Sequence, residues 1–511
     1  MSALVPLLVA LPLAGAAATL LLGRYTAALR VMSVAVHAGL LGCAVALLVL
    51  ADRDGPQVVV LGGWPARIGI ALVADRLSAV LLVVALTVLL TVLGYAIAQS
   101  ASDPDGGFPI TVFHPAYLVL TAGVCLSFLS GDLFTLFVGF EMLLTASYVL
   151  VTIGGTAERV RAGSTYILVS LAGSILFLLS VAVVYAATGT VNLAELSLRL
   201  GELEPGLRDT IGLMLLVVFS IKAAAVPLHP WLPDSYPSAP SPVTAVFAGL
   251  LTKVGVYAII RTQTLLFGDS ATGPLLVLAV LTMIVGMLGA LVQTDLNRIL
   301  SFVLVGHIGF MLFGLAVFTV AGVAGAIFYT VHHILAQAAL FLVSGLIERR
   351  TGTVSLDELG GVAKLSPLLG VLFAVPAMSL AGIPPFSGFL AKVSLLVAAP
   401  GQGVAVLVGA VVVVVASLLT VRAMGIVWTR AFWGTPVAPR PDRDPTDGVV
   451  VGTDRRVPTG MLLSTAVLIG AGLVIIAVAG PLQALTERAA TDLLARDPYV
   501  VAVLGEAVSG G

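Results

Sequence analysis

Residues 221–261 read IKAAAVPLHPWLPDSYPSAPSPVTAVFAGLLTKVGVYAIIR, and this stretch decides the fold class. Both of its ends are apolar, and each end carries one lysine, Lys222 and Lys253. Six prolines stand between the lysines: Pro227, Pro230, Pro233, Pro237, Pro240 and Pro242. Proline removes a backbone donor and clashes with the preceding turn, so a helix that enters this stretch must break. The pattern is typical of a broken transmembrane helix in a transporter.

A second stretch, AGIPPFSGFLAK at 381–392, repeats this arrangement later in the chain. Pro384, Pro385 and Gly388 interrupt an apolar run, and Lys392 follows them. A helix break frees backbone groups to meet ions or water, and a matched pair of breaks in two halves of a chain points to inverted repeats around a central pathway. The competing interpretation is that these prolines only punctuate loops.

The rest of the chain is apolar as well. Of its 511 residues, 59% are hydrophobic and 10% are charged, which is more apolar surface than a soluble protein of this size buries. Hydropathy predicts an all-α polytopic membrane protein whose seventh and twelfth helices are broken. It has about fourteen transmembrane helices, near 3–23, 28–50, 72–98, 112–129, 133–153, 162–187, 209–226, 241–261, 273–293, 296–319, 321–346, 366–398, 403–429 and 460–480.

Three stretches are too polar to span: 188–208, the Pro/Asp/Arg-rich loop at 430–459, and the region from about 482 onward, which we expect to form an amphipathic surface helix. Lysine and arginine collect in cytoplasmic loops. Loops after odd-numbered spans hold Arg24, Arg30, Arg159, Arg161, Arg298, Arg349, Arg350, Lys364, Arg430, Arg440, Arg443, Arg455 and Arg456. Loops after even-numbered spans hold fewer: Arg53, Arg67, Arg76, Arg199, Arg208, Arg261, Arg488 and Arg496. The sequence therefore predicts cytoplasmic odd loops and both termini outside.

Most of the lysines lie where the sequence predicts membrane rather than water. The chain has only four, and Lys222, Lys253 and Lys392 lie in apolar stretches rather than in loops. A charged side chain at the bilayer centre costs at least about 2.5–3.5 kcal/mol, so it persists only if it is paired, hydrated or neutral. A buried lysine with a movable carboxylate partner can load and release a proton. The alternative is that a lysine near a span end extends to the interface.

Glu141, in SGDLFTLFVGFEMLLTASYVL, is interpreted as the only acidic residue deep within a predicted span. A lone buried carboxylate needs a cationic partner, and Lys222 is the candidate, so we expect an intramembrane ion pair that opens and closes. The alternative is a structural pair with no switching role. Asp132, nine residues earlier, is expected near the end of the same helix, as an interface or capping residue rather than a relay group.

Histidines supply the remaining titratable groups, because they exchange protons near neutral pH. His307, and the adjacent His332 and His333, lie in the tenth and eleventh spans, between Lys253 and Lys392 in sequence. Together they are expected to form a horizontal polar axis bridged by water. Each could instead only bond a neighbouring carbonyl, and His229, in PLHPW, has a structural interpretation of equal weight. The accessory candidates are Asp132, His229, Asp234 and Gln337.

Several kinds of site have no support in the sequence. Cys43 and Cys125 lie in separate apolar runs without metal, haem or redox spacing, and we expect both to be structural. No nucleotide loop, nucleophile context or dinucleotide fingerprint occurs, so we expect no catalytic residues and no cofactor. A net charge of -1 suggests no nucleic-acid partner. Energy must then come from an ion gradient or from a partner.

Taken in order, four motifs carry a resemblance: SGDLFTLFVGFEMLLTASYVL, the stretch at 221–261, TDLNRILSFVLVGHIGFML, and LDELGGVAKLSPLLGVLFAVPAMSLAGIPPFSGFLAK. Over about residues 70–430 the chain resembles the antiporter-like subunits of complex I and of Mrp-type multisubunit Na+/H+ antiporters. The resemblance implies fourteen helices with two inverted five-helix repeats. It also implies matches of Glu141 to the helix-five glutamate, and of Lys222, Lys253 and Lys392 to the lysines of helices seven, eight and twelve.

The resemblance also implies a domain division: 1–111 with helices one to three, 112–261 as the first inverted repeat, 262–429 as the second, and 430–511 with the polar loop, helix fourteen and the tail. The motif GDLFTLFVGFEMLLTASY is more similar to Mrp D subunits than to complex I subunits, and Lys392 agrees. One position departs from the family: Gln337 stands where many members have a lysine, which leaves His332 or His333 to carry that step.

The expectation is therefore a proton-translocating subunit of a cation/proton antiporter in a bacterial plasma membrane, working with other subunits, membrane lipid, protons and Na+, and not an enzyme. Two alternatives stay open. One is a proton-pumping subunit of complex I or a related hydrogenase. The other, of a different class, is a structural scaffold without an ion path.

Overall fold

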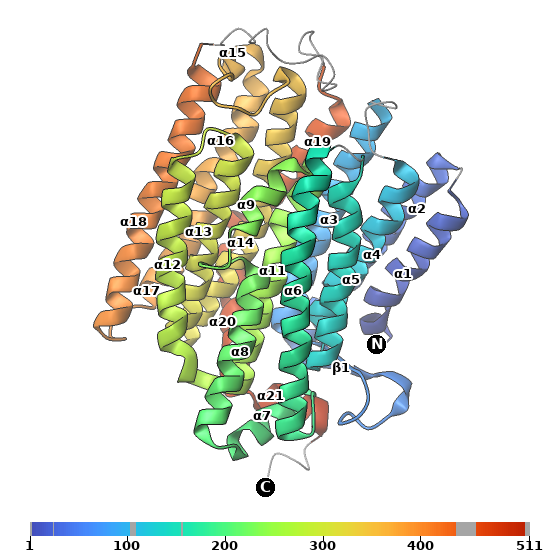
Figure 1. Cartoon of the computed structure of the whole chain (residues 1–511), viewed down its shortest axis with the longest axis vertical. Helices are drawn as coiled ribbons and strands as arrows, with labels where there is room; N and C mark the ends of the chain where they lie inside the picture. The colour runs from blue at the N-terminus through green and yellow to red at the C-terminus, as the bar shows by residue number, and fades with distance from the viewer. Residues whose placement is uncertain (1–2, 24, 103–108, 155–156, 436–455, 506–511) are drawn as a thin grey trace.

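The computed structural model describes residues 3–23, 25–102, 109–154, 157–435 and 456–505. Figure 1 shows long helices running side by side between an upper end, where α15 (Val362–Leu365) lies, and a lower end with α7 (Leu193–Arg199) and α21 (Asp497–Leu504). Within the described ranges, eleven helical segments are long and apolar enough to cross a membrane, counting 241–291 as one. The prediction of an all-α polytopic membrane protein is confirmed.

The elements follow one another in three groups. The first comprises α1 (Leu4–Leu21), α2 (Thr26–Asp54), the antiparallel strands β1 (Gln57–Val60) and β2 (Ala71–Ala74), and α3 (Arg76–Ser102). The second comprises α4 (Ile110–Leu129), α5 (Leu133–Thr152), α6 (Ala157–Thr188), α8 (Pro205–Ala223), α9 (Trp231–Ser235), α10 (Ser241–Val246) and α11 (Thr252–Thr262). The third comprises α12 (Thr272–Leu291), α13 (Leu296–Ala316), α14 (Val320–Thr351), α16 (Pro367–Ala381), α17 (Ser387–Val397), α18 (Val404–Val427), α19 (Thr459–Ala477) and α20 (Ala479–Ala495). Every predicted span overlaps one of these helices, while the number of crossings stays a prediction.

Both predicted breaks are present. Helix α8 ends at Ala223, the next residue Ala224 takes a left-handed conformation with φ 58°, and regular helix resumes only at α9. Helix α16 ends at Ala381, Gly382 has φ 83°, and α17 starts after the two prolines. The indole nitrogen of Trp231 donates to the carbonyl of Ile221, which satisfies one of the acceptors that the first break frees.

Helix α14 forms the centre of the bundle. All residues in its most apolar 18-residue stretch are buried. In the corresponding stretch of the neighbouring α13, 94% of the residues are buried, against 28% in α18 and in α19. Helices buried on every side carry apolar residues all round rather than on one stripe. Polar side chains on α13 and α14 therefore face protein and not lipid.

Two of the three polar stretches lie within the described residues, whereas most of the loop at 430–459 does not. Residues 188–208 hold the short helix α7 at the lower end (Figure 1), and the C-terminal region forms α20 and α21. Helix α20 buries Ala490 and Leu493 and exposes Glu487 and Arg488, which fits the predicted amphipathic helix. Residues 436–455 of the predicted loop, with Arg440, Arg443 and Arg455, lie outside the described residues. Arg24 does as well.

Two loops at opposite ends of the bundle match each other in sequence and in hydrogen bonding. Residues 188–196 read TGTVNLAEL at the lower end, and residues 351–359 read TGTVSLDEL at the upper end (Figure 1). Each loop adds one isolated bridge, Asp132 to Asn192 and Asp295 to Ser355, and each of these aspartates caps the helix that follows it. The sequence carries this signal, although the hydropathy pattern alone does not reveal it.

Candidate functional site

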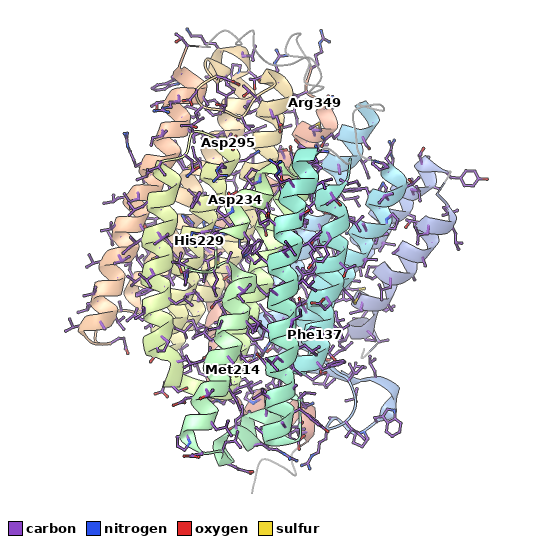
Figure 2. The ribbon with its side chains drawn as sticks, in the orientation of Figure 1. Phe137, Met214, His229, Asp234, Asp295 and Arg349 are labelled. Carbon is purple, nitrogen blue, oxygen red and sulfur yellow. The ribbon has the colours of Figure 1, made fainter. Side chains whose placement is uncertain are left out.

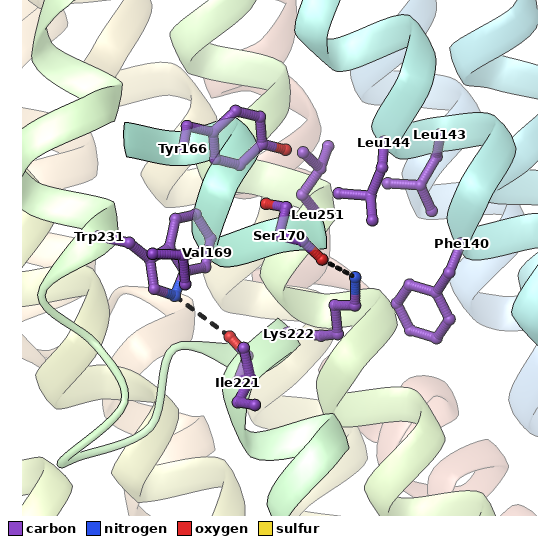
Figure 3. A pocket seen from close by; sticks show the side chains of 10 residues that line it. All are labelled: Phe140, Leu143, Leu144, Tyr166, Val169, Ser170, Ile221, Lys222, Trp231 and Leu251. Carbon is purple, nitrogen blue, oxygen red and sulfur yellow. Dashed lines mark hydrogen bonds between the residues drawn. The ribbon is translucent and has the colours of Figure 1, made fainter. Parts of the chain in front are cut away.

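Lys222 lies one residue before the end of α8, at the first break. Its side chain is buried, and Nζ donates to the Ser170 carbonyl oxygen at 3.3 Å and to Oγ of Ser174 at 2.9 Å. Figure 3 shows the ammonium group in a small cavity beside the Phe140 ring, 5.8 Å from the ring centre. The cavity offers about 20 Å³ to the centres of water molecules, which is room for about one water.

Glu141 lies on the face of α5 that this chain leaves exposed, together with Phe134, Thr145 and Val149 at helical spacing. Its Oε1 atom is buried and has no hydrogen-bond partner among the described residues. The expected ion pair with Lys222 is not formed in this structure, since no contact between them within 4.0 Å occurs in the described part of the chain. The two groups still lie close enough for the charge of Glu141 to act on Lys222.

Lys253 is fully buried at the start of α11, directly after a π-helical turn, Phe247–Leu251. Its Nζ donates to the carbonyl oxygen of Ala248 at 2.6 Å, and in the described ranges it makes no ion pair. The π-helical turn is a form that often marks functional sites. Gly255 packs against the end of α8, where an added Cβ would lie 2.6 Å from the Ala223 nitrogen, so the two lysine-bearing helices touch here.

The three predicted histidines gather between Lys253 and Lys392. His307 bonds through Nδ1 to the Tyr329 hydroxyl at 2.9 Å and through Nε2 to the Thr420 hydroxyl at 3.1 Å. His333 lies with its ring centre 5.2 Å from that of His307, and both of its ring nitrogens are buried without a partner in the described structure. The Tyr329 ring contacts all three imidazoles, at 5.7–6.3 Å between ring centres, so the histidines form one cluster.

His332 and Lys392 meet at the second break. Nδ1 of His332 bonds to the Ser387 hydroxyl at 2.9 Å, at the first residue of α17. Lys392 donates to the carbonyl oxygens of Leu380 and Ala381, at 3.1 and 2.8 Å, which are acceptors left by the end of α16. A cation at a helix C-terminus also meets the negative end of the helix dipole.

These side chains form a buried line of amines and imidazoles. The ammonium of Lys392 lies 5.2 Å over the Phe310 ring, which stacks on Tyr329, the partner of His307. Unpartnered polar atoms in such a site mark positions for ordered water. Because like charges disfavour each other in a low dielectric, a proton on one member of the line opposes a proton on the next. Each member of the line therefore weakens its neighbour's hold on a proton.

Three accessory candidates, Asp132, Asp234 and His229, lie outside this line. Asp132 caps α5, since its carboxylate accepts from the Thr135 amide at 2.6 Å, and burial raises its pKa. Asp234 pairs with Arg298 at 3.0 Å near the upper end (Figure 2). His229 is half-buried beside Phe302 in the first break.

Gln337 lies on α14, one turn beyond His333, and its amide nitrogen donates to the Leu300 carbonyl at 2.8 Å. Its Oε1 atom is buried and has no partner in the described part of the chain.

One buried charged pair was not predicted from the sequence. Arg261 was placed in a loop, but it lies within α11, 2% exposed, and both of its terminal nitrogens contact the Asp75 carboxylate at 2.7 Å. Asp75 is itself 6% exposed, so Glu141 is not the only buried acidic residue in the predicted spans. Asp75 lies near the start of the apolar run at 72–98 and Arg261 ends the run at 241–261, and no sequence pattern indicates that the two meet.

Comparisons with known proteins show which family this chain resembles. Residues 130–420 match the family described as NADH:quinone oxidoreductase/Mrp antiporter, TM. The D subunit of the Na(+)/H(+) antiporter from Alkalihalophilus pseudofirmus is 41% identical over 438 residues, 85% of this chain and 88% of the relative. A chain of the Mrp complex from Dietzia sp. DQ12-45-1b superposes with a TM-score of 0.90 at 33% identity, covering 99% of this chain and 100% of that one. A chain of the archaeal membrane-bound sulfane sulfur reductase superposes with a TM-score of 0.86 at 25% identity, with the same coverage.

Proposed function

This chain belongs to the NADH:quinone oxidoreductase/Mrp antiporter family, and on that premise we propose that it carries protons as the D-type subunit of a multisubunit Na+/H+ antiporter. It is a transporter subunit and not an enzyme. The observation that carries the proposal is the buried line from Lys253 through His333, His307 and His332 to Lys392, since lysine has no structural reason to enter an apolar core three times.

The proposed route has three stages. A proton enters beside Glu141 and Lys222, passes laterally through Lys253 and the histidines, and leaves near Lys392. Lys222 is held by the neutral oxygens of Ser170 and Ser174, and the charge of Glu141 acts on it from a distance. Movement of Glu141 toward Lys222 would favour the charged form of Lys222. Withdrawal of Glu141 would release the Lys222 proton toward Lys253.

The exposed face of α5 supports a neighbouring subunit as the partner of Glu141. A carboxylate that faces lipid is expensive, and the rest of that face is apolar or weakly polar, with Phe134 and Val149. A second subunit that covers this face and brings a cation would pair with the part of the Glu141 side chain that this chain leaves exposed. The antiporter complex supplies such neighbours.

The proposal includes two inverted five-helix repeats, 112–261 and 262–429, between the N-terminal helices 1–111 and the C-terminal region 430–511. The two matching loops, TGTVNLAEL and TGTVSLDEL, support it because they follow helices of equal length, α6 and α14 with 32 residues each, and lie at opposite ends. The two breaks, each with a lysine, support it in the same way.

The chain is a multi-pass membrane protein, and we place it in the bacterial plasma membrane with both termini outside. Positive charge supports this orientation: Arg349 lies toward the upper end (Figure 2), opposite α21 at the lower end (Figure 1). Enzymatic reporters fused to either terminus test it, and activity in the cytoplasm would contradict it.

The leading alternative is a proton pump in a respiratory complex, because the family description includes NADH:quinone oxidoreductase and the fold also occurs in the archaeal reductase. The neighbouring genes distinguish the antiporter from the respiratory pump. Genes for small Mrp-type subunits favour the antiporter, and genes for quinone-binding and Fe–S subunits favour the pump. A scaffold without an ion path predicts instead that the buried lysines are dispensable for transport.

Proton-coupled Na+ efflux from vesicles that contain the full complex tests the proposal. Lys392→Ala is expected to abolish exchange with assembly retained, because the last titratable group of the line is lost. Lys364→Ala is the matched control, as Lys364 is an exposed lysine on α15, and it should exchange at the wild-type rate. An assembled Lys392→Ala complex with wild-type exchange would contradict the proposed exit.

A further inference from the structure

Helix α18 presents one face to the outside of the molecule. Its other side packs against α12 and α16, and Figure 1 shows it at the edge of the bundle. Six positions recur along the free face at alternating three- and four-residue spacing: Val408, Val411, Val415, Leu418, Arg422 and Gly425. The first four are apolar side chains that are 46–64% exposed. Apolar exposure alone does not say whether lipid or protein covers this face, but the last two positions do.

Arg422 is the charged residue on this face. It lies inside the apolar helix, its side chain is exposed, and it makes no hydrogen bond or ion pair with any described residue. A guanidinium stays charged at physiological pH, so Arg422 cannot become neutral as a buried lysine can. A charged group within the hydrocarbon of a bilayer persists only when it is paired or hydrated. Arg422 therefore needs an anionic group from outside this chain.

The depth of Arg422 argues against a lipid phosphate as that group. Arg430, eight residues later, lies 3.8 Å from Asp357 in the upper loop and so marks the upper membrane surface. Eight residues of helix span about 12 Å, and half the hydrocarbon layer is about 15 Å thick. Side chains on a helix lean toward its N-terminus, which for α18 is the lower end. Arg422 thus lies deep in the membrane and leans away from the nearer lipid headgroups.

The shape of the face fits a helix. Gly425 lies one turn above Arg422, and no described atom lies within 4 Å of a Cβ added there. Small residues at helix interfaces in membranes let a second backbone approach closely. Alternating three- and four-residue spacing is also the period of a seam between two packed helices. A surface covered by lipid requires neither feature, whereas a surface covered by a transmembrane helix uses both.

No carboxylate of this chain can supply the missing charge. Glu141 is a half-buried carboxylate inside a span, but Figure 1 places its helix, α5, on the other side of the bundle from α18. The other subunits of the antiporter complex supply the candidates.

We propose that the free face of α18 docks a membrane-spanning helix of another subunit of the complex, and that an aspartate or glutamate on that helix pairs with Arg422. The planar guanidinium can hold a carboxylate through two parallel hydrogen bonds, which fixes the position of the partner helix along α18. Each charge is satisfied only when the two subunits are together, so the pair favours this partner over helices without a carboxylate. The proposal concerns assembly and does not depend on the proton route.

Assembly of the full complex tests the pair. An affinity tag on another subunit is used to recover the complex from membranes in mild detergent, and the fraction of this chain recovered with it is measured. Arg422→Leu is expected to lower that fraction by about tenfold or more, because the partner carboxylate is left buried without a cation. Arg422→Lys keeps the charge and should retain most of the recovery.

Arg430→Leu is the matched control. Arg430 belongs to the same helical segment, and its contact with Asp357 is between side chains that are 53% and 64% exposed. Surface ion pairs of this kind contribute little, so this variant should be recovered with the complex as the wild type is. Equal recovery of Arg422→Leu and Arg430→Leu would overturn the proposal.

Cross-linking identifies the occupant of the face. A photoreactive amino acid at Leu418, one turn below Arg422, is expected to link this chain to a membrane-spanning helix of another subunit that carries an acidic residue near the link. Arg422→Glu should then block assembly, and exchange of that acidic residue for arginine should restore it. Links only to lipid, or only to a second copy of this chain, would overturn the proposal. The Leu418 link decides the matter if Arg422→Leu does not reach the membrane, since Arg422 is intact in that chain.

Discussion

At the scale of single residues, the three buried lysines share one kind of partner. Each ammonium donates to a backbone carbonyl: Lys222 to Ser170, Lys253 to Ala248, and Lys392 to Leu380 and Ala381. None pairs with a carboxylate within 4.0 Å in the described ranges. Carbonyl oxygens accept a hydrogen bond without adding an opposite charge, so they stabilise an ammonium less than a carboxylate does. Such a lysine is held in place and can still lose its proton.

Glu141→Gln tests the one carboxylate that acts on this series. The substitution keeps size and shape but removes the charge that acts on Lys222, so loading of Lys222 should become less favourable. Exchange by the full complex should fall by about tenfold or more, since a positioned proton-transfer group contributes about 10²–10⁴-fold. Glu487→Gln, an exposed glutamate on α20, is the control and should exchange normally. Equal rates for the two variants would remove Glu141 from the route.

The residue types of the candidate site were predictable from the sequence, but the hydrogen-bond partners of those residues were not. Three of only four lysines in apolar runs identified the site from composition alone. The carbonyl partners are invisible in a sequence, because every residue has one. Tyr329 and Thr420, which hold His307, were missed for the related reason that a hydroxyl in an apolar span usually bonds its own helix.

At the scale of elements, close backbone contact at the breaks sets the positions of the charged groups. Gly388, in the first turn of α17, lies against the last turn of α16: an added Cβ would be 1.8 Å from the Ser379 carbonyl oxygen and 2.9 Å from Nε2 of His332. The prolines indicated that both helices break, but no sequence pattern indicated how closely the two halves pack.

Gly388→Ala should therefore separate the two halves of the second broken helix. Overpacking in a tight contact costs about 1–3 kcal/mol, so the melting temperature of the complex should fall and exchange should weaken as His332 moves. Gly425→Ala on α18 is the control, because no atom lies within 4 Å of its added Cβ, and it should be neutral or slightly stabilising. Unchanged melting and exchange in Gly388→Ala would show that α16 and α17 adjust freely.

At the scale of the whole molecule, ion pairs tie the end of the chain to its beginning. Arg76 contacts both Asp52, at the end of α2, and Asp492 on α20, while Arg488 of α20 contacts Asp52 at 2.9 Å. The contacts of Asp492 with Arg76 and of Arg488 with Asp52 join segments more than four hundred residues apart in sequence. Asp52 and Arg76 lie near the ends of predicted spans, and Arg488 and Asp492 lie in the polar stretch from about 482, but hydropathy carried no sign that they would meet.

Arg76→Gln should loosen this tie. The Arg76 side chain is 17% exposed and makes two hydrogen bonds to carboxylates. Loss of each bond is expected to lower the free energy of unfolding by about 1.5–3 kcal/mol at most. Limited proteolysis should then release the region of α20 and α21 faster than in the wild type. Arg456→Gln, at an exposed position, serves as the comparison. Equal proteolysis rates would mean that apolar packing of α20 on α14 is sufficient.

The paired loops TGTVNLAEL and TGTVSLDEL carry a last consequence. If the chain spans the membrane as proposed, they meet two different aqueous compartments, with different pH and salt, yet they keep one pattern of turn and bridge. Natural selection on solvent chemistry would have driven them apart. What both share is backbone geometry: a glycine with positive φ after the first threonine, and threonine hydroxyls that bond the backbone nearby. A chimera that exchanges the two nonapeptides should accordingly fold, because both form the same backbone turn whichever compartment they face.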